Sequence, residues 1–396
     1  MSTVKETILD DSESELNVWN EKLWSSEIFW RDHYDWLKSN GYLLRPRYHP
    51  DWVPSWTGSK RFPLFFEDYG AQFPLFLYNL DAIRVADGKP VMLRLADPPS
   101  VSDELKIARL VSSGDMRSDP RNHCVQIYDT LELPEATSNG RSCIVVMPYL
   151  VPWDQVKFQT VGEVVDFCSQ VFEGLQFMHS HNIAHNDAKN NNIMMDWSPL
   201  YPKPPHPYDA SMRMDWKGAS KPRSRTLYPV RYHFIDWDLS KQYNPLIRTN
   251  RIPMRLPGYG GDRTVPEFNR KEPCNPFAVD VYCLGNVIRE KFIEGAPIFD
   301  DYPRRNVGFM RELIADMTHD DPSKRPTMDE VVVRFEEISK TLSWWKLRSR
   351  VSDKRFPLLL HRLYSPIHCS VQLSHILRLK RAIPKHTPPK DSALPS

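Results

Sequence analysis

Residues 183–196 of this chain read IAHNDAKNNNIMMD, a polar loop between two apolar runs. Three of its side chains, Asp187, Lys189 and Asn192, form a set that suits phosphoryl transfer. An Asp can accept the proton of a hydroxyl, a Lys can neutralise the migrating phosphoryl group, and an Asn offers a neutral oxygen to Mg²⁺. We therefore expect Asp187 and Lys189 to be catalytic and Asn192 to be a metal ligand.

A further carboxylate suited to this site follows a short strand-like run at residues 232–235. That run delivers Asp236, Trp237 and Asp238. Because a carboxylate at the end of a strand is a natural metal ligand, we expect Asp236 to join Asn192 in holding the metal.

The pattern of apolar residues changes near Pro152. Before it, strand-like runs occur at 75–80, 91–95, 125–128 and 143–147, and Asp87 and Gly88 predict a hairpin turn. After it, apolar residues recur at spacings of three and four from Val164 to Met178, which predicts a long helix. Further helices are expected at 279–291, 309–317 and 328–342. A strand-rich segment followed by a helix-rich one predicts an α+β fold with two lobes.

The opening loop is similar to the HRDxxxxN catalytic loop of the eukaryotic protein kinases, and Asp236 stands where their DFG motif begins. Small-molecule kinases of the aminoglycoside and choline type carry a similar loop, but three further motifs favour the protein kinases. They are VPE at 265–267, which resembles APE, DVYCLG at 280–285, which resembles DxWSxG, and DPSKRPT at 321–327, which resembles DPxxRP. The sequence at 172–179 and 192–196 most resembles a fungal branch of kinase-like proteins.

The resemblance covers about residues 66–340 and implies a bilobal protein-kinase-like fold. It divides the chain into an N-terminal extension with an aromatic helix (1–65), a small β-rich lobe (66–150), a larger helical lobe (151–340) and a basic tail (341–396). A Pro-rich segment at 198–229 lies between two strand-like runs, and we expect a mobile insertion in a hairpin there. The resemblance also implies ATP and Mg²⁺ as cofactors, an ion pair between Glu267 and Arg325, and an anchoring role for Asp280 at the catalytic loop.

The chain departs from the kinase pattern mainly where the nucleotide would bind. Arg94 stands at the position of the strand Lys, and the exchange is not conservative because a guanidinium is larger and forked. Its expected partner is Glu104, and the remaining cofactor-binding candidates are Met147 and Tyr149. No GxGxxG loop is found near Gly70, so the backbone lacks the glycines that let it wrap phosphates closely.

Three departures concern other motifs. Asp238 replaces the Gly of DFG, and Asn186 replaces the Arg of HRD. Gly260 stands where serine/threonine kinases place Ser or Thr. Two functions therefore compete: an atypical protein kinase of the Ser/Thr type, and a pseudokinase that acts as a non-catalytic interaction scaffold. A small-molecule kinase is a distant third.

Composition excludes some classes of protein. The chain has 396 residues and is 12% aromatic, which excludes disorder throughout. No apolar run approaches the 18 residues of a membrane-spanning helix, and the first 20 residues carry no signal-peptide pattern. Six widely spaced cysteines predict buried, reduced thiols and a cytoplasmic or nuclear location.

Charge is unevenly distributed along the chain. The net charge is +2, but residues 341–396 hold eleven Lys or Arg against two Asp, which gives this tail +9. Such a tail is suited to an acidic protein, an acidic lipid or a nucleic acid, or is simply a solvated extension.

Overall fold

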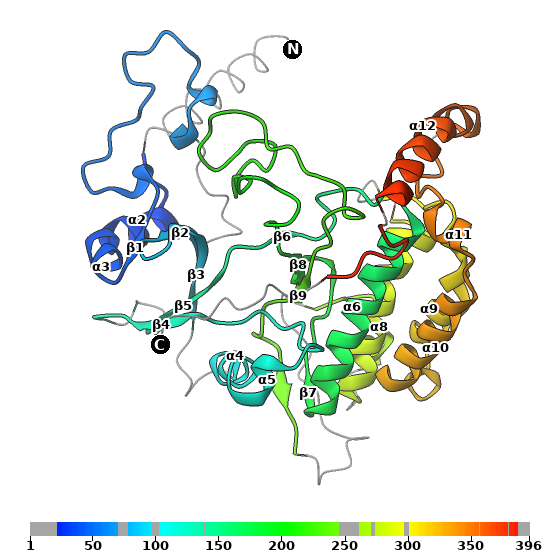
Figure 1. The fold of residues 1–396 in the computed structure, drawn as a ribbon. Coiled ribbons are helices and arrows are strands. Elements are labelled where there is room, and N and C mark those ends of the chain that lie inside the picture. Colours follow the sequence, from blue (N-terminus) through cyan, green and yellow to red (C-terminus); the bar gives the residue numbers. More distant parts are fainter. Residues whose placement is uncertain are drawn as a thin grey trace, which may run out of the picture. The chain divides into compact units, whose positions relative to one another are not determined.

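The computed structural model describes residues 22–69, 78–96, 103–135, 137, 140–244, 261–270, 274–296, 301–355, 357–378 and 380–386. These residues have an α+β fold (Figure 1). The chain divides into two compact units. Unit 1 comprises residues 1–98, 127–149 and 203–221, and unit 2 comprises residues 99–126, 150–202 and 222–396.

Unit 1 is built on a five-stranded antiparallel sheet of order β1-β2-β3-β5-β4. Its strands are β1 (Tyr42–Leu43), β2 (Asn79–Arg84), β3 (Pro90–Ala96), β4 (Asp129–Glu132) and β5 (Cys143–Pro148). The predicted hairpin joins β2 to β3, and Gly88 takes the left-handed conformation that its turn requires, with φ +68°. The strand expected at 75–80 falls mostly outside the described residues and is seen from Asn79 onward.

The aromatic helix expected near the N-terminus forms two pieces, α2 (Ser25–Asp32) and α3 (Tyr34–Ser39). Trp30, Tyr34 and Leu37 share a core with sheet residues such as Leu80 and Leu93. A fully buried ion pair, Arg47 to Glu27 at 2.8 Å, ties this region together. Residues 22–65 are therefore part of the same unit as the sheet, not a separate extension.

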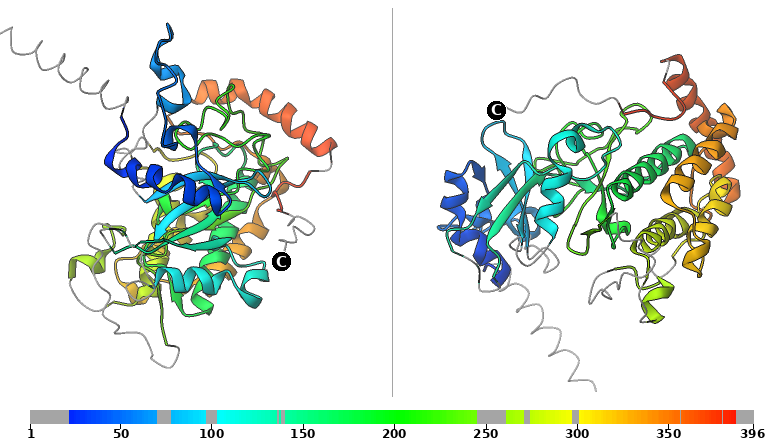
Figure 2. Two further views of the ribbon diagram at one scale, coloured as in Figure 1. Left: turned by 90° about the vertical axis from the view of Figure 1, so that its left-hand side faces the viewer. Right: turned by 90° about the horizontal axis from the view of Figure 1, so that it is seen from below.

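Unit 2 contains most of the helices. The long helix predicted from Val164 to Met178 is α6 (Val161–Ser180), which packs against α10 (Met328–Thr341). The other predicted helices are α8 (Pro276–Ile288) and α9 (Arg311–Met317), which pack against each other (Figures 1 and 2). Shorter helices are α4 (Glu104–Val111), α5 (Gly114–Ser118) and α7 (Pro266–Arg270).

Two small sheets of unit 2 hold the loop 185–192. One has the order β6-β8-β9, with β6 (Val151–Pro152), β8 (Ile193–Met195) and β9 (Tyr232–Phe234). The other pairs β7 (Ile183–Ala184) with β10 (Lys241–Gln242). The pairing of β8 with β9 confirms the predicted hairpin.

The prediction of a strand at 125–128 is wrong. The strand of this region is β4, which begins at Asp129. Val125 instead donates a single backbone hydrogen bond to Phe234 in unit 2, at 2.9 Å. Phe234 in turn donates to the carbonyl of His123, so the backbone forms one isolated bridge and not a ladder, and the buried Asn122 side chain adds bonds to Val111 and to Cys124. Apolar runs alone do not reveal such bonds.

The Pro-rich segment 198–229 does not match the expectation of a mobile insertion with little to bury. Within unit 1, His206 is fully buried and its Nε2 lies 3.0 Å from Glu67. Within unit 2, Arg225 is 2% exposed and donates to the carbonyl of Trp153, and Thr226 donates to Glu163. The segment is fixed by polar contacts, which leave no periodic apolar signal.

The basic tail is also folded over most of the described length. It forms α11 (Trp344–Arg348) and α12 (Leu358–Leu377). Residues on both sides of α12 reach the start of α6: Val161 donates to the carbonyl of Ser349, and a Cβ on Gly162 would clash with the carbonyl oxygen of Ala382. The expectation of a solvated extension is therefore wrong for these residues.

Among the described residues, none of the helices is both long and apolar enough to cross a bilayer. Five of the six cysteines are buried, as expected. The exception is Cys369, which is exposed on α12.

Candidate active site

The loop 185–192 leaves β7 and enters β8, and a carboxylate from another helix fixes its start. Asp280 of α8 accepts the backbone N–H groups of His185 and Asn186, each at 2.7 Å. His179, near the end of α6, lies 3.0 Å from the same carboxylate. Asp280 is fully buried. The anchoring contact that the kinase resemblance implies is therefore present.

The other side of the loop is joined to residues 235–240. Asn186 donates to the carbonyl of Leu239 at 2.8 Å, and the hydroxyl of Ser240 donates to the carbonyl of His185 at 3.0 Å. Asn186 and Asp236 have φ angles of +62° and +71°. Non-glycine residues adopt this left-handed backbone at a cost, and such residues often lie at functional sites.

Asp187, Lys189 and Asn192 converge as predicted. One carboxylate oxygen of Asp187, Oδ2, accepts from the amide of Asn192 at 2.8 Å and lies 3.0 Å from the ammonium of Lys189. The other oxygen, Oδ1, is buried and has no hydrogen-bond partner among the described residues. Burial raises the pKa of Asp187, Lys189 lowers it, and Asp236 adds a smaller rise.

Unit 2 also contains a cluster of three carboxylates. Oxygens of Glu104, Asp236 and Asp238 all lie within 4.8 Å of one another. Glu104 comes from the first turn of α4 and is buried, whereas Asp238 is exposed. Such hard oxygen ligands are those that Mg²⁺ prefers. From the sequence, Asp238 was expected to be able to join Asp236 and Asn192 in a cation site, but Glu104 was assigned to Arg94 and not to this cluster.

Asn192 fits the same metal chemistry from the loop. Its amide nitrogen makes both of its side-chain bonds, to the backbone and to the carboxylate of Asp187. Its side-chain oxygen is therefore the atom that a cation would use.

The other residues predicted to bind the cofactor lie in unit 1. Arg94 lies on β3 opposite Asn79 and Val145, and Met147 lies on β5 opposite Met92. Tyr149 is buried, and its hydroxyl donates to the carbonyl of Pro205 at 3.1 Å. Gly70 and Gly260 lie outside the described residues.

The expected pair of Glu267 and Arg325 is present. Two parallel bonds of 2.7 Å join the guanidinium to the carboxylate, and both residues are buried. Arg325 also stands over the ring of Tyr282, 4.8 Å from its centroid. This bidentate geometry is the strongest form of such a pair.

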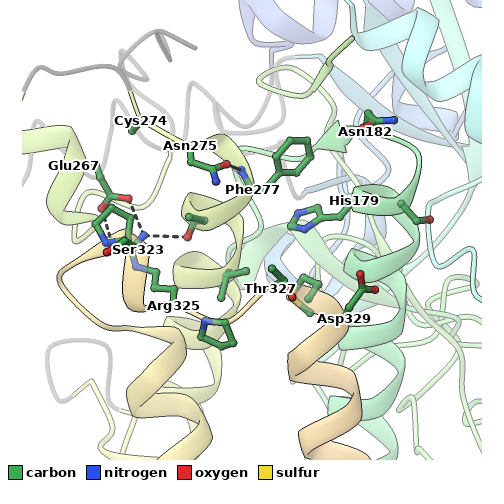
Figure 3. A pocket seen from close by; sticks show the side chains of 16 residues that line it. His179, Asn182, Glu267, Cys274, Asn275, Phe277, Ser323, Arg325, Thr327 and Asp329 are labelled. Atoms are coloured by element: carbon green, nitrogen blue, oxygen red, sulfur yellow. Dashed lines mark hydrogen bonds and ion pairs between the residues drawn. The ribbon is translucent and has the colours of Figure 1, made fainter. Parts of the chain in front are cut away.

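A pocket of about 740 Å³ adjoins this pair. Figure 3 shows Arg325 and Glu267 on one side of it, and His179 and Asn182 on the other. His179 connects the pocket to Asp280, and through Asp280 to the start of the loop. The pocket lining does not include Asp187, so this hollow is separate from the catalytic candidates.

One supporting residue was missed by the sequence analysis. The indole nitrogen of Trp153 donates to the carbonyl of Asn190 within the loop, at 3.2 Å. Trp153 is buried and stacks on Phe167 of α6, with the ring centroids 4.1 Å apart. A lone Trp between a predicted strand and a predicted helix carries no signal for such a role.

Comparison of the sequence with protein-family models found no match, and comparison with curated proteins found none either.

Proposed function

We propose that this chain is a protein-kinase-like enzyme of the Ser/Thr type, which transfers the γ-phosphoryl group of ATP to a protein hydroxyl. The observation that carries the proposal is that the two carboxylate oxygens of Asp187 have different surroundings. One oxygen is held by Lys189 and Asn192, and the other, Oδ1, has no partner among the described residues. A carboxylate held in this way is oriented yet can still accept a proton.

The roles of the loop residues follow from these contacts. Oδ1 of Asp187 would accept the proton of the attacking hydroxyl, and the raised pKa makes this carboxylate a better base than a solvated one. Lys189, which already pairs with Asp187, would balance the negative charge of the phosphoryl group in flight. Asp280 would keep the loop in register by holding two successive amides.

The proposal also includes Mg²⁺ and ATP as cofactors, which specific donor atoms of this chain would bind. Asp236, with Glu104 and Asp238 beside it, and the side-chain oxygen of Asn192 are the groups that would hold Mg²⁺. When bound, the metal would neutralise charge on the phosphates. In unit 1, Arg94, Met147 and Tyr149 are the residues that the kinase resemblance assigns to the nucleotide.

A non-catalytic scaffold is the second candidate, and two features favour it. Arg94 brings a forked cation to a place that suits a compact ammonium. Asp238 adds a third carboxylate to a cluster that already contains Glu104 and Asp236, so binding of a nucleotide phosphate there depends on a cation to offset the charge.

The deciding experiment compares phosphoryl transfer in three proteins: wild type, Asp187→Asn and Asp329→Asn. Asp329 is an exposed acid on α10 and serves as the matched control. Asp187→Asn should lower autophosphorylation and turnover on a generic protein substrate by about 10²–10⁴-fold, because it removes the general base. Its thermal midpoint should stay close to that of wild type, since the change is nearly isosteric.

Two further measurements separate the candidates. Arg94→Lys should raise turnover, because it restores the ammonium group. Mg²⁺-ATP should raise the melting temperature by mass action if it binds specifically. Equal background signal in all variants, together with no thermal shift, would exclude the enzyme and leave the scaffold.

A further inference from the structure

Helix α12 exposes most of its apolar residues. Leu359, Leu363 and Leu377 are 70%, 62% and 77% exposed. Five more of its large apolar side chains have exposed fractions between 42% and 60%: Leu358, Tyr364, Ile367, Val371 and Leu373. At about 100° per residue these eight positions extend over roughly two-thirds of the circumference of the helix, as one very broad face. A face of this size is unusual on a soluble surface and marks an interaction site.

The buried side of α12 is polar, which is the reverse of an ordinary amphipathic helix. Gln372 and His375 are each 4% exposed, and Gln372 accepts a bond from the buried guanidinium of Arg348 at 3.2 Å. Arg348 also donates to the carbonyl of Lys380 and stands over the ring of Trp344. The helix is therefore fixed to unit 2 by polar bonds, with its apolar side turned outward.

The charges that residues 357–386 themselves carry are all positive, whereas the pocket beside Tyr364 also holds Asp154, Asp301 and Asp353. From residue 357 to residue 386 the sequence has no Asp or Glu, and it carries Arg362, Arg378, Lys380, Arg381 and Lys385. The side chains of Arg378, Lys380, Arg381 and Lys385 are exposed. On α11, which contacts α12 through Arg348, Trp345 is 75% exposed. Trp side chains favour the boundary between water and lipid.

We propose that α12, with Trp345 of α11, is a docking surface for an anionic lipid bilayer. Exposed Leu and Ile side chains would enter the boundary between headgroups and acyl chains, while Arg and Lys would meet the anionic headgroups. A second copy of this helix is a poorer occupant, because it would bring cations against cations. The hydrogen bonds of Gln372 and His368 with Arg348 keep the helix attached to the protein, so it would lie on the membrane and not cross it.

Three of the exposed residues need separate treatment in the experiment. Tyr364, Ile367 and Val371 border a pocket of about 790 Å³ that Phe158 and Phe292 also line. The Leu residues of the face do not line this pocket. Substitutions at Leu363 and Leu377 therefore test the outward face without altering the hollow.

The test is co-sedimentation of the full-length chain with vesicles, one set of phosphatidylcholine and one containing phosphatidylserine. Wild type should bind the anionic vesicles much more strongly, and added salt should weaken the binding. Leu363→Ser and Leu377→Ser should each lower the partition coefficient about tenfold. Lys380→Gln and Arg381→Gln should each lower it about fivefold.

Matched controls stand on other parts of the chain. Leu64 is 66% exposed in unit 1, and Lys340 is exposed on α10. Leu64→Ser and Lys340→Gln should leave vesicle binding unchanged. Because all the substituted side chains are exposed, circular dichroism should show every variant folded.

Three outcomes would overturn the proposal. The first is no difference between the two kinds of vesicle. The second is an equal loss in Leu64→Ser and Leu363→Ser. The third is concentration-dependent dimerisation in analytical ultracentrifugation that Leu363→Ser abolishes, without vesicle binding by wild type, which would assign the face to a second copy. None of these readouts depends on phosphoryl transfer. The membrane-docking proposal is therefore tested independently of the proposed kinase function.

Discussion

Buried charged side chains in unit 2 are matched by specific partners. Asp280 is satisfied by two backbone amides and His179, and Arg325 is satisfied by Glu267 and the carbonyl of Ala278. A buried charge that loses its partner keeps its desolvation cost, so these residues are sensitive points of the fold.

Arg325→Ala should lower the free energy of unfolding by about 3–5 kcal/mol, because it leaves the Glu267 carboxylate buried and uncompensated. Urea denaturation followed by circular dichroism would measure the loss. Arg334→Ala is the matched control, since Arg334 pairs with Asp316 on the surface, where both side chains are more than a third exposed. The control should cost under about 1 kcal/mol. Similar losses in both variants would contradict the structural role of the buried pair.

Asp166 of α6 predicts a pH dependence of stability. Burial raises its pKa to about 7, with Glu163 adding to the rise and Gln170 and Arg225 opposing it. In the unfolded chain the pKa of an Asp is about 3.9. Between these values the folded state binds a proton that the unfolded state does not, so stability falls as the pH rises from about 4 to 7.

Asp166→Asn should remove this dependence and stabilise the protein at pH 8, by up to about 4 kcal/mol. Thermal or urea midpoints measured from pH 4 to 8 would test it, with Asp329→Asn as the control for the substitution itself. A variant that is less stable than wild type at pH 8 would mean that the folded state uses the ionised carboxylate.

At the scale of elements, periodic segments were predicted well and polar ones were not. The face of α6 and the hairpin of β2 and β3 follow from apolar spacing and from one Gly with a left-handed backbone. The segment 198–229 and the residues after 341 were misjudged, because their contacts come from isolated side chains such as His206, Arg225 and Arg348. Single polar contacts at long sequence separation have no local pattern.

The segment 198–229 should therefore be important for stability. Arg225 donates to the carbonyls of Trp153 and Val156 and stands over the ring of Phe158. Arg225→Ala should cost about 2–4 kcal/mol, because two buried acceptors lose their donor and a cation–π contact is lost. Arg223→Ala, at an exposed position two residues earlier, should cost under about 1 kcal/mol. Urea midpoints of the two variants would decide it, and a neutral Arg225→Ala would restore the view of this segment as dispensable.

At the scale of the whole molecule, the candidate site was predicted in part. The sequence motifs brought Asp187, Lys189 and Asn192 together correctly, because loop spacing fixes their neighbourhood. The cluster of Glu104 with Asp236 and Asp238 depends on where α4 lies in unit 2, and no motif encodes that position. The division of the chain also differs from the expected segments, because residues 99–126 and the tail both belong to unit 2.

The contact between Gly162 and Ala382 offers a test at this scale. Gly162→Ala would place a methyl group against the backbone of residue 382, so the segment after α12 must move away from α6. We expect a loss of about 1–3 kcal/mol and faster proteolysis of residues 350–386. Gly308→Ala, where nothing lies within 4 Å of the new methyl group, should behave like wild type. Unchanged proteolysis in Gly162→Ala would show that the segment docks elsewhere.

The same contact has a consequence for how the chain is made. A ribosome releases residues in order, so every segment that unit 1 uses has emerged once residue 221 is free. The start of α6 must wait for residues 349–351 and 382, which are translated more than 180 positions after Val161. During that interval the start of α6 lacks these backbone contacts. Nascent unit 2 is therefore expected to need chaperones for longer than unit 1.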